Sequence, residues 1–135
     1  MSEMKRIYLE GLTLMSQGED DGALSKFKEV LELKPSDDTE KFWVSSCHFS
    51  ISVIHYGRGE MRKAKRSLLK SMKDRDPASW TQLALGDISE SLGEHAAAGR
   101  YYDRCEELAT LEKDEDLLQV LAKRKRASRS RKKSR

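Results

Sequence analysis

Cysteine and histidine in the middle of the chain are the residues whose types could do chemistry. Cys47 and His48 are adjacent, and His55 follows seven residues after His48, which places both histidines on one face of a helix. Thiolate and imidazole are ligands of zinc, but a zinc site needs four ligands that converge. No CxxC or HExxH pattern accompanies these residues. We therefore expect both histidines to pack between helices rather than to bind a metal.

The other patterns that could support catalysis are incomplete. Gly57 and Gly59 stand close together, but no Gly-Lys-Ser/Thr follows them and a helix rather than a strand precedes them, so they predict a turn and not a phosphate-binding loop. The serines form no nucleophile elbow. Cys105 falls on the packing face of a predicted helix and is expected to be a small buried hydrophobe. The sequence predicts no enzyme activity, no cofactor and no metal site.

Length and composition indicate one helical domain. The chain has 135 residues, of which 36% are charged, 37% are hydrophobic and only 2 are proline. Such a composition is typical of a helical chain with a thin core. No apolar run approaches the roughly 18 residues that a membrane-spanning helix needs. The first residues, MSEMKRIYLE, lack the apolar core of a signal peptide, and two cysteines cannot form a disulfide framework, so we expect a reducing compartment, the cytoplasm or the nucleus.

The net charge of +3 hides an acidic body and a basic tail. Residues 123–135 contain nine bases and no acid, whereas residues 1–122 carry 17 bases and all 23 acids. The bases of the tail are Lys123, Arg124, Lys125, Arg126, Arg129, Arg131, Lys132, Lys133 and Arg135. We expect a folded domain over residues 1–122 and a disordered tail over 123–135, because the last residues lack apolar side chains to bury.

An internal repeat organises the folded part. In each copy a glycine is followed five residues later by alanine and nine residues later by a large apolar residue. The three sets are Gly18, Ala23 and Phe27; Gly59, Ala64 and Leu68; and Gly93, Ala98 and Tyr102. The second and third sets are 34 residues apart and the first and second are 41 apart. A period of this length is the signature of stacked supersecondary units.

Each set fits a hairpin of two helices. The glycine suits the turn after the first helix, and the small residues Gly11 and Gly86 let two helices approach closely. Phe27 and Tyr102 lie one helical turn after an alanine and would fill the space between helices. Pro35 and Pro77 would end the second helices. The pattern predicts helices at about 4–17, 21–34, 38–57, 60–74, 78–92, 95–111 and 113–126.

The seven additional residues between the first two copies can be placed in two ways. We favour two added turns at the start of the helix 38–57, where the side chains of Ser36, Asp37 and Asp38 could cap it. These turns would carry Phe42 and Trp43. The alternative is an insertion in the preceding loop.

The pattern resembles the tetratricopeptide repeat, with a glycine in the first helix, then Ala-x-x-x-Phe and a late proline. The copy with Gly11, Ala23 and Phe27 matches best, and the middle copy departs most, with Ser52 in the place of the small glycine. The usual tryptophan is absent from its place in every copy. The resemblance covers about residues 4–112. It implies an all-α, right-handed α-solenoid of helical hairpins, closed by a last helix, that binds proteins and is not catalytic.

In this family the first helix of each hairpin lines a concave groove. The matching positions in this chain are Tyr8, Leu12, Met15, Phe49, Val53, Tyr56, Trp80, Leu83, Asp87 and Glu90. The expected groove is therefore apolar over its first two repeats and acidic over the third. Such a groove suits a helical or extended partner segment with apolar anchors and one or two basic residues. The alternative is that several of these side chains pack between helices.

Some members of the family bind the C-terminal carboxylate of heat-shock chaperones through basic side chains and asparagine. The matching positions here are Tyr8, Leu12, Val53, Trp80 and Ala84, none of which can donate a charged hydrogen bond. The sequence therefore predicts no binding of chaperone tails.

Two classes of function remain. The first is an adaptor or assembly factor that binds one protein in the groove. The second is an accessory protein of a nucleic-acid or ribosomal complex, whose basic tail contacts phosphates without sequence specificity or directs the chain to the nucleus. The tail could also pair with acids of its own domain, or with anionic lipid. Self-association through exposed Phe42 and Trp43 is a further possibility.

Overall fold

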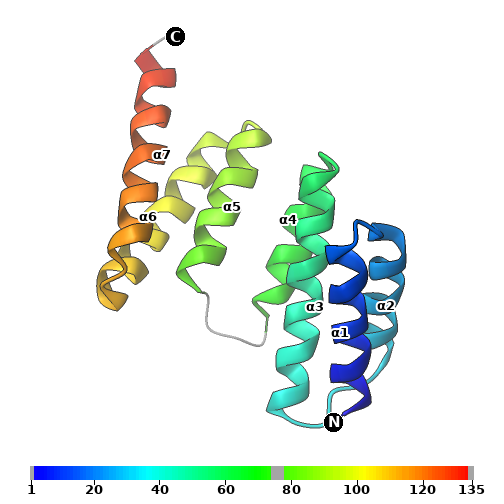
Figure 1. Cartoon of the computed structure of the whole chain (residues 1–135). Helices are drawn as coiled ribbons and strands as arrows, with labels where there is room; N and C mark the ends of the chain where they lie inside the picture. Colours follow the sequence, from blue (N-terminus) through cyan, green and yellow to red (C-terminus); the bar gives the residue numbers. More distant parts are fainter. Residues whose placement is uncertain (1, 74–77, 134–135) are drawn as a thin grey trace. The chain divides into compact units, whose positions relative to one another are not determined.

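The computed structural model describes residues 2–73 and 78–133, with side chains as far as Ser130, and over these residues it contains helices and no strand (Figure 1). The helices are α1 (Glu3–Ser16), α2 (Asp20–Glu32), α3 (Asp38–Gly57), α4 (Met61–Ser71), α5 (Ser79–Ser91), α6 (His95–Glu112) and α7 (Glu115–Lys133). Consecutive helices pair as hairpins, α1 with α2, α3 with α4 and α5 with α6. The predicted all-α fold is confirmed. Pro77, which we expected to end a hairpin, lies outside the described residues.

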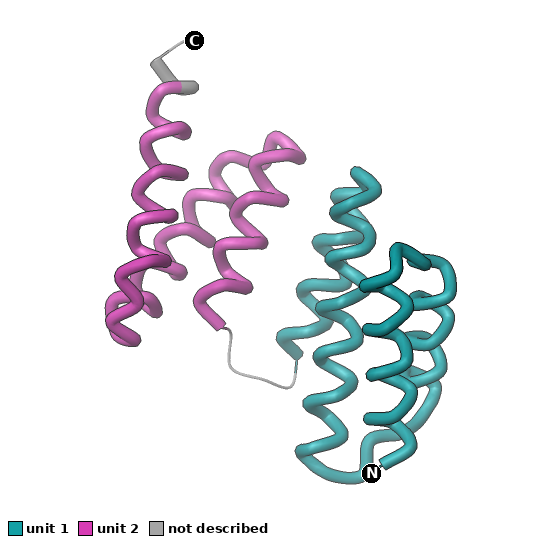
Figure 2. The backbone as a smooth tube through the Cα atoms, in the orientation of Figure 1, with its two compact units in different colours: residues 1–76 teal, residues 77–135 magenta. Residues whose placement is uncertain are grey.

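The chain divides into two compact units, residues 1–76 and residues 77–135 (Figure 2). The first unit contains the hairpins α1–α2 and α3–α4, and α3 packs on both α1 and α2. The second contains the hairpin α5–α6, and α7 packs on α6. We expected a single domain over residues 1–122, and the two units are therefore described separately below.

An aromatic ring against a helical glycine holds two of the hairpins together. In α1, a Cβ added at Gly11 would lie 2.6 Å from the ring of Phe27 on α2. In α5, a Cβ at Gly86 would overlap the ring of Tyr102 on α6. Both rings are buried. Gly11 and Gly86 therefore let an aromatic ring lie directly on the backbone of the neighbouring helix, as the repeat predicted.

The turn within each hairpin also follows the prediction. Gly18, Gly59 and Gly93 have φ values of 77°, 76° and 76°, in the left-handed region that favours glycine. The alanines that follow them, Ala23 and Ala98 among them, have no exposed surface.

The seven additional residues lengthen α3 rather than a loop. This helix has 20 residues, whereas the equivalent α5 has 13. A reciprocal cap starts it: the backbone N–H of Glu40 donates to Asp37 Oδ1 over 2.8 Å, and the Glu40 carboxylate accepts from the backbone N–H of Ser36 over 2.9 Å. Phe42 is exposed as expected, but Trp43 is half-buried because it packs on the core of the first unit. Trp43 therefore offers less surface to a second copy of the chain than Phe42 does.

The last helix is longer than predicted. We placed its end near residue 126 and expected disorder from residue 123, but α7 continues to Lys133. Leu117 and Leu121 are buried against α5 and α6 residues, so the start of the helix belongs to the core of the second unit. Beyond it, lysine, arginine and alanine are good helix formers, and Lys125 forms ion pairs with Asp103 and Glu106 of α6.

Two glycine substitutions in the second unit test the role of the ring contact. Gly86→Ala places a methyl group against the buried Tyr102 ring and should lower the free energy of unfolding by about 1–3 kcal/mol. Gly99→Ala, within α6, meets nothing within 4 Å and should raise that free energy by about 0.5–1 kcal/mol. Urea denaturation followed by circular dichroism measures both. Equal effects of the two substitutions would show that the contact is not tight.

Candidate partner-binding surface

The first unit presents an apolar stripe on α3. Phe49, Val53 and Tyr56 are spaced by four and three residues and are 44%, 44% and 47% exposed. On α1, which packs on α3, Tyr8, Leu12 and Met15 have the same spacing and are half-buried against the core. We call these six residues the α1–α3 face. The predicted groove residues of the first two repeats therefore lie on two helices that pack on each other, and those of α3 are the more exposed.

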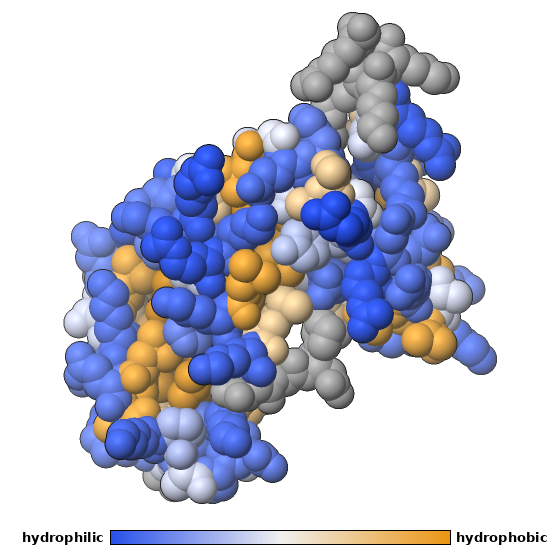
Figure 3. Space-filling view, turned by 180° about the vertical axis from the view of Figure 1, so that it is seen from behind, coloured by the Kyte–Doolittle hydropathy of each residue, from blue (hydrophilic) through white to orange (hydrophobic). Residues whose placement is uncertain are grey.

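The stripe is exceptional for its lack of charge. No Asp, Glu, Lys or Arg occurs in α3 from Phe42 to Gly57, although 36% of the chain is charged. Figure 3 shows the opposite side of the molecule from Figure 1, on which hydrophobic patches are separated by strongly hydrophilic side chains. A row of exposed aromatic and aliphatic side chains on a stretch of helix without charged residues is typical of an interaction surface.

Aromatic contacts fix one end of the α1–α3 face. The rings of Tyr8 and Trp43 have centroids 5.4 Å apart, and Phe42 meets Trp43 edge-on at 5.1 Å. Lys5 Nζ lies 5.5 Å from the centroid of the Trp43 ring. Phe42 stands seven residues before Phe49 and continues the exposed stripe. Its place on this stripe was not predicted, although the seven-residue spacing on one helix was the signal that could have revealed it.

The expected groove residues of the second unit are mostly engaged within that unit. Leu83 is only 6% exposed, because it packs in the core with α6 and α7, so it offers little surface to a partner. Asp87 Oδ1 accepts hydrogen bonds from the Tyr102 hydroxyl over 2.7 Å and from Arg124 Nε over 2.9 Å. Glu90 lies 3.1 Å from His95 Nδ1. Trp80 is 51% exposed and remains available.

The contact with Asp87 also changes the pKa of Tyr102. Burial and the Asp87 carboxylate raise the pKa of Tyr102 above its ordinary range, so its hydroxyl stays protonated and donates. The acidic surface that we expected to meet a partner's basic residues is therefore occupied in part by Arg124 of α7.

The bases of the C-terminal segment fall into two groups. Arg124 and Lys125 pair with acids of the second unit, and Lys125 lies 2.8 Å from Glu106 and 3.1 Å from Asp103. Partial burial opposes the charge of Lys125, but these carboxylates outweigh it and raise its pKa. Lys123, Arg126 and Arg129 are exposed on α7. The side chains of Arg131, Lys132 and Lys133, and the whole of Arg135, lie outside the described residues.

The cysteines and histidines hold no arrangement suited to chemistry. Cys47 and Cys105 are free and buried, and burial raises their thiol pKa values to about 12 and about 11. Neither is therefore a nucleophile at neutral pH. His55 Nδ1 lies 3.1 Å from Glu60, and His48 lines a cavity described below. Within residues 2–73 and 78–130, no three His, Cys, Asp or Glu side chains come together as metal ligands.

None of the described helices combines the length and the apolar character that crossing a bilayer requires.

Comparison with known proteins identifies the repeat. Residues 81–110 match the tetratricopeptide repeat model. Among solved structures, the crystal structure of MamA resembles the fold with a TM-score of 0.61 and 15% sequence identity, over 98% of this chain and 82% of that chain. No curated protein matches the sequence. Residues 81–110 are therefore similar to a tetratricopeptide repeat, and the chain as a whole shares the fold of that solved structure.

Proposed function

We propose that this protein is a non-catalytic adaptor or assembly factor that binds a segment of one partner protein on the α1–α3 face. Tetratricopeptide repeats generally mediate protein–protein interaction, which gives the class of function. The observation that carries the proposal is the exposed, uncharged stripe of Phe49, Val53 and Tyr56. Aromatic side chains that are exposed in the free protein and lie on a rigid helix are the usual energetic centres of interfaces.

The surface indicates the chemistry of the partner. Because the stripe runs along one helix at spacings of four and three residues, it suits a helical segment with apolar side chains at matching spacing. The absence of charge from Phe42 to Gly57 means that a charged residue of the partner would lose hydration there without gaining a counter-ion. The basic residues that we first expected in the ligand have no support on this face.

Substitution of the stripe tests the proposal. Phe49→Ala with Tyr56→Ala should weaken binding of the partner at least tenfold, because each truncated aromatic anchor at an interface costs about 1–2 kcal/mol or more. The matched control is Leu69→Ala, which removes an equally exposed apolar side chain, 43% exposed, from α4. Quantitative affinity capture with each variant, followed by binding isotherms with the purified partner, measures the difference.

The helical signal in far-ultraviolet circular dichroism should be the same for all three proteins, since every substituted side chain is exposed. Binding that is unchanged by the double substitution, or reduced equally by Leu69→Ala, would place the interaction elsewhere and reject the proposal.

A second candidate function is supported by the exposed bases of α7. Lys123, Arg126 and Arg129 recur every three residues on a helix, whereas Arg124 and Lys125 pair with acids of the second unit. A row of bases without aromatic side chains suits phosphates of a nucleic acid, contacted without sequence specificity. In this role the protein would be an accessory component of a nucleic-acid or ribosomal complex.

Charge removal at those three positions tests the second function. Lys123→Gln, Arg126→Gln and Arg129→Gln together should reduce the salt dependence of binding to duplex RNA, because fewer phosphates are neutralised; the slope of log K against log salt should fall by about 2–3. Fluorescence anisotropy at several salt concentrations measures it. These substitutions leave Arg124 and Lys125 intact, unlike deletion of residues 123–135. An unmodified protein that fails to bind RNA at low salt would exclude this function.

A further inference from the structure

The two additional turns of α3 create a recess in the first unit. Helix α4 ends at Ser71, and the Ser45 hydroxyl donates a hydrogen bond to the Ser71 carbonyl oxygen, which aligns the end of α4 with the third turn of α3. The residues of α3 before Ser45 therefore have no α4 residue beside them. Leu31 of α2 lines the space beside this part of α3.

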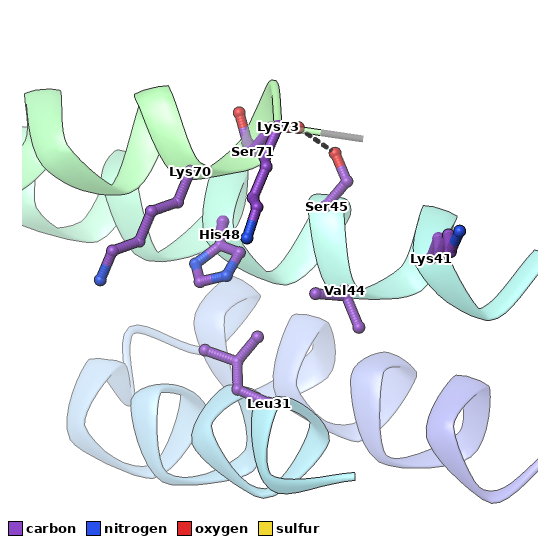
Figure 4. Close-up of a pocket in the computed structure, with 8 residues that line it drawn as sticks. All are labelled: Leu31, Lys41, Val44, Ser45, His48, Lys70, Ser71 and Lys73. Carbon is purple, nitrogen blue, oxygen red and sulfur yellow. Dashed lines mark hydrogen bonds between the residues drawn. The ribbon is translucent and has the colours of Figure 1, made fainter. Parts of the chain in front are cut away.

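A cavity of about 400 Å³ occupies the recess. Its walls come from α2, α3 and the end of α4 (Figure 4). The residues that line it are Leu31, Lys41, Val44, Ser45, His48, Lys70, Ser71 and Lys73. A volume of this size falls within the range of small-molecule sites, about 300–1,000 Å³.

The lining combines an apolar floor with positive charge. Leu31 and Val44 form the apolar part, and in Figure 4 the His48 ring lies between Leu31 and the end of α4, from which Lys70 and Lys73 extend. Three of the eight lining residues are lysines and none is acidic. A cavity with this lining attracts an anion and gives an apolar group a place to be buried.

His48 senses the charge in this cavity. Burial and the positive charge of Lys70 lower the pKa of its imidazole, so the ring is neutral at pH 7. An anion beside the ring would offset the positive charge of Lys70 and raise that pKa. The ring is therefore a reporter of occupancy as well as a hydrogen-bonding group, whichever tautomer it adopts.

We propose that this cavity binds a phosphate monoester whose organic part is apolar, with Lys70, Lys73 and His48 at the phosphate and Leu31 and Val44 at the organic group. A phosphate monoester carries close to two negative charges at neutral pH, which suits several lysines better than a single carboxylate does. None of the residues that line the cavity belongs to the α1–α3 face. The proposed site therefore does not depend on the function proposed above.

Nuclear magnetic resonance of the full chain with ¹⁵N-labelled histidine tests the site. Phenyl phosphate should shift the His48 imidazole signals in a saturable manner, with a dissociation constant below about 1 mM, and should raise the pKa of His48. The signal is assigned with His48→Gln. Inorganic phosphate should bind at least threefold more weakly, because it leaves Leu31 and Val44 uncovered, and benzoate should also bind more weakly, because it carries one charge.

Lys70→Gln with Lys73→Gln should weaken binding of phenyl phosphate at least tenfold. The control Lys28→Gln with Arg62→Gln removes the same charge at exposed positions of α2 and α4 that do not line the cavity, and should change affinity less than twofold. The site is refuted by absence of saturation up to about 20 mM phenyl phosphate, or by equal weakening in both double variants. Benzoate or inorganic phosphate binding as tightly as phenyl phosphate would refute the assigned ligand class.

Discussion

The packing of an aromatic ring on a helical glycine is the constraint on which each unit depends. Phe27 lies on Gly11 in the first unit and Tyr102 lies on Gly86 in the second, and both rings are buried. Because no Cβ intervenes, the two helices of a hairpin approach until the ring meets backbone, which fixes their separation. That separation decides which side chains of α1, α3 and α5 face inward, and therefore which remain for a partner.

The middle hairpin satisfies the same constraint with different residues. Ser52 stands where the other hairpins have glycine, and the side chain that follows Ala64 by one turn is Leu68 rather than an aromatic ring. Both Ser52 and Leu68 are buried. A larger side chain on one helix is thus accompanied by a smaller one on the other, as expected where total volume must be conserved. The hairpin geometry is therefore compatible with different residues at these buried positions.

Most of the fold could be predicted from the sequence because its determinants are local. Helical periodicity, turn glycines and small packing residues each act within one hairpin, and the helix boundaries of α1 to α6 follow from them. Side-chain pairing between distant elements could not be predicted in the same way. Nothing in the spacing indicated that Arg124 would pair with Asp87, or that α7 would bury Leu83, since both depend on where α7 packs. The placement of Phe49, Val53 and Tyr56 on one face of α3 could be predicted, because they follow a simple local period.

The length of the insertion in α3 has a consequence for the evolution of this surface. Seven residues come within about 20° of two complete rotations of an α-helix, so side chains on either side of the added segment keep nearly the same azimuth about the axis. Phe42 is therefore in phase with Phe49, and the hairpin could lengthen without reorienting anything downstream. An added segment of five residues would instead place its side chains close to 140° out of phase with the stripe that follows. Additions of seven residues are thus the ones by which such a helix can extend its exposed apolar stripe in phase.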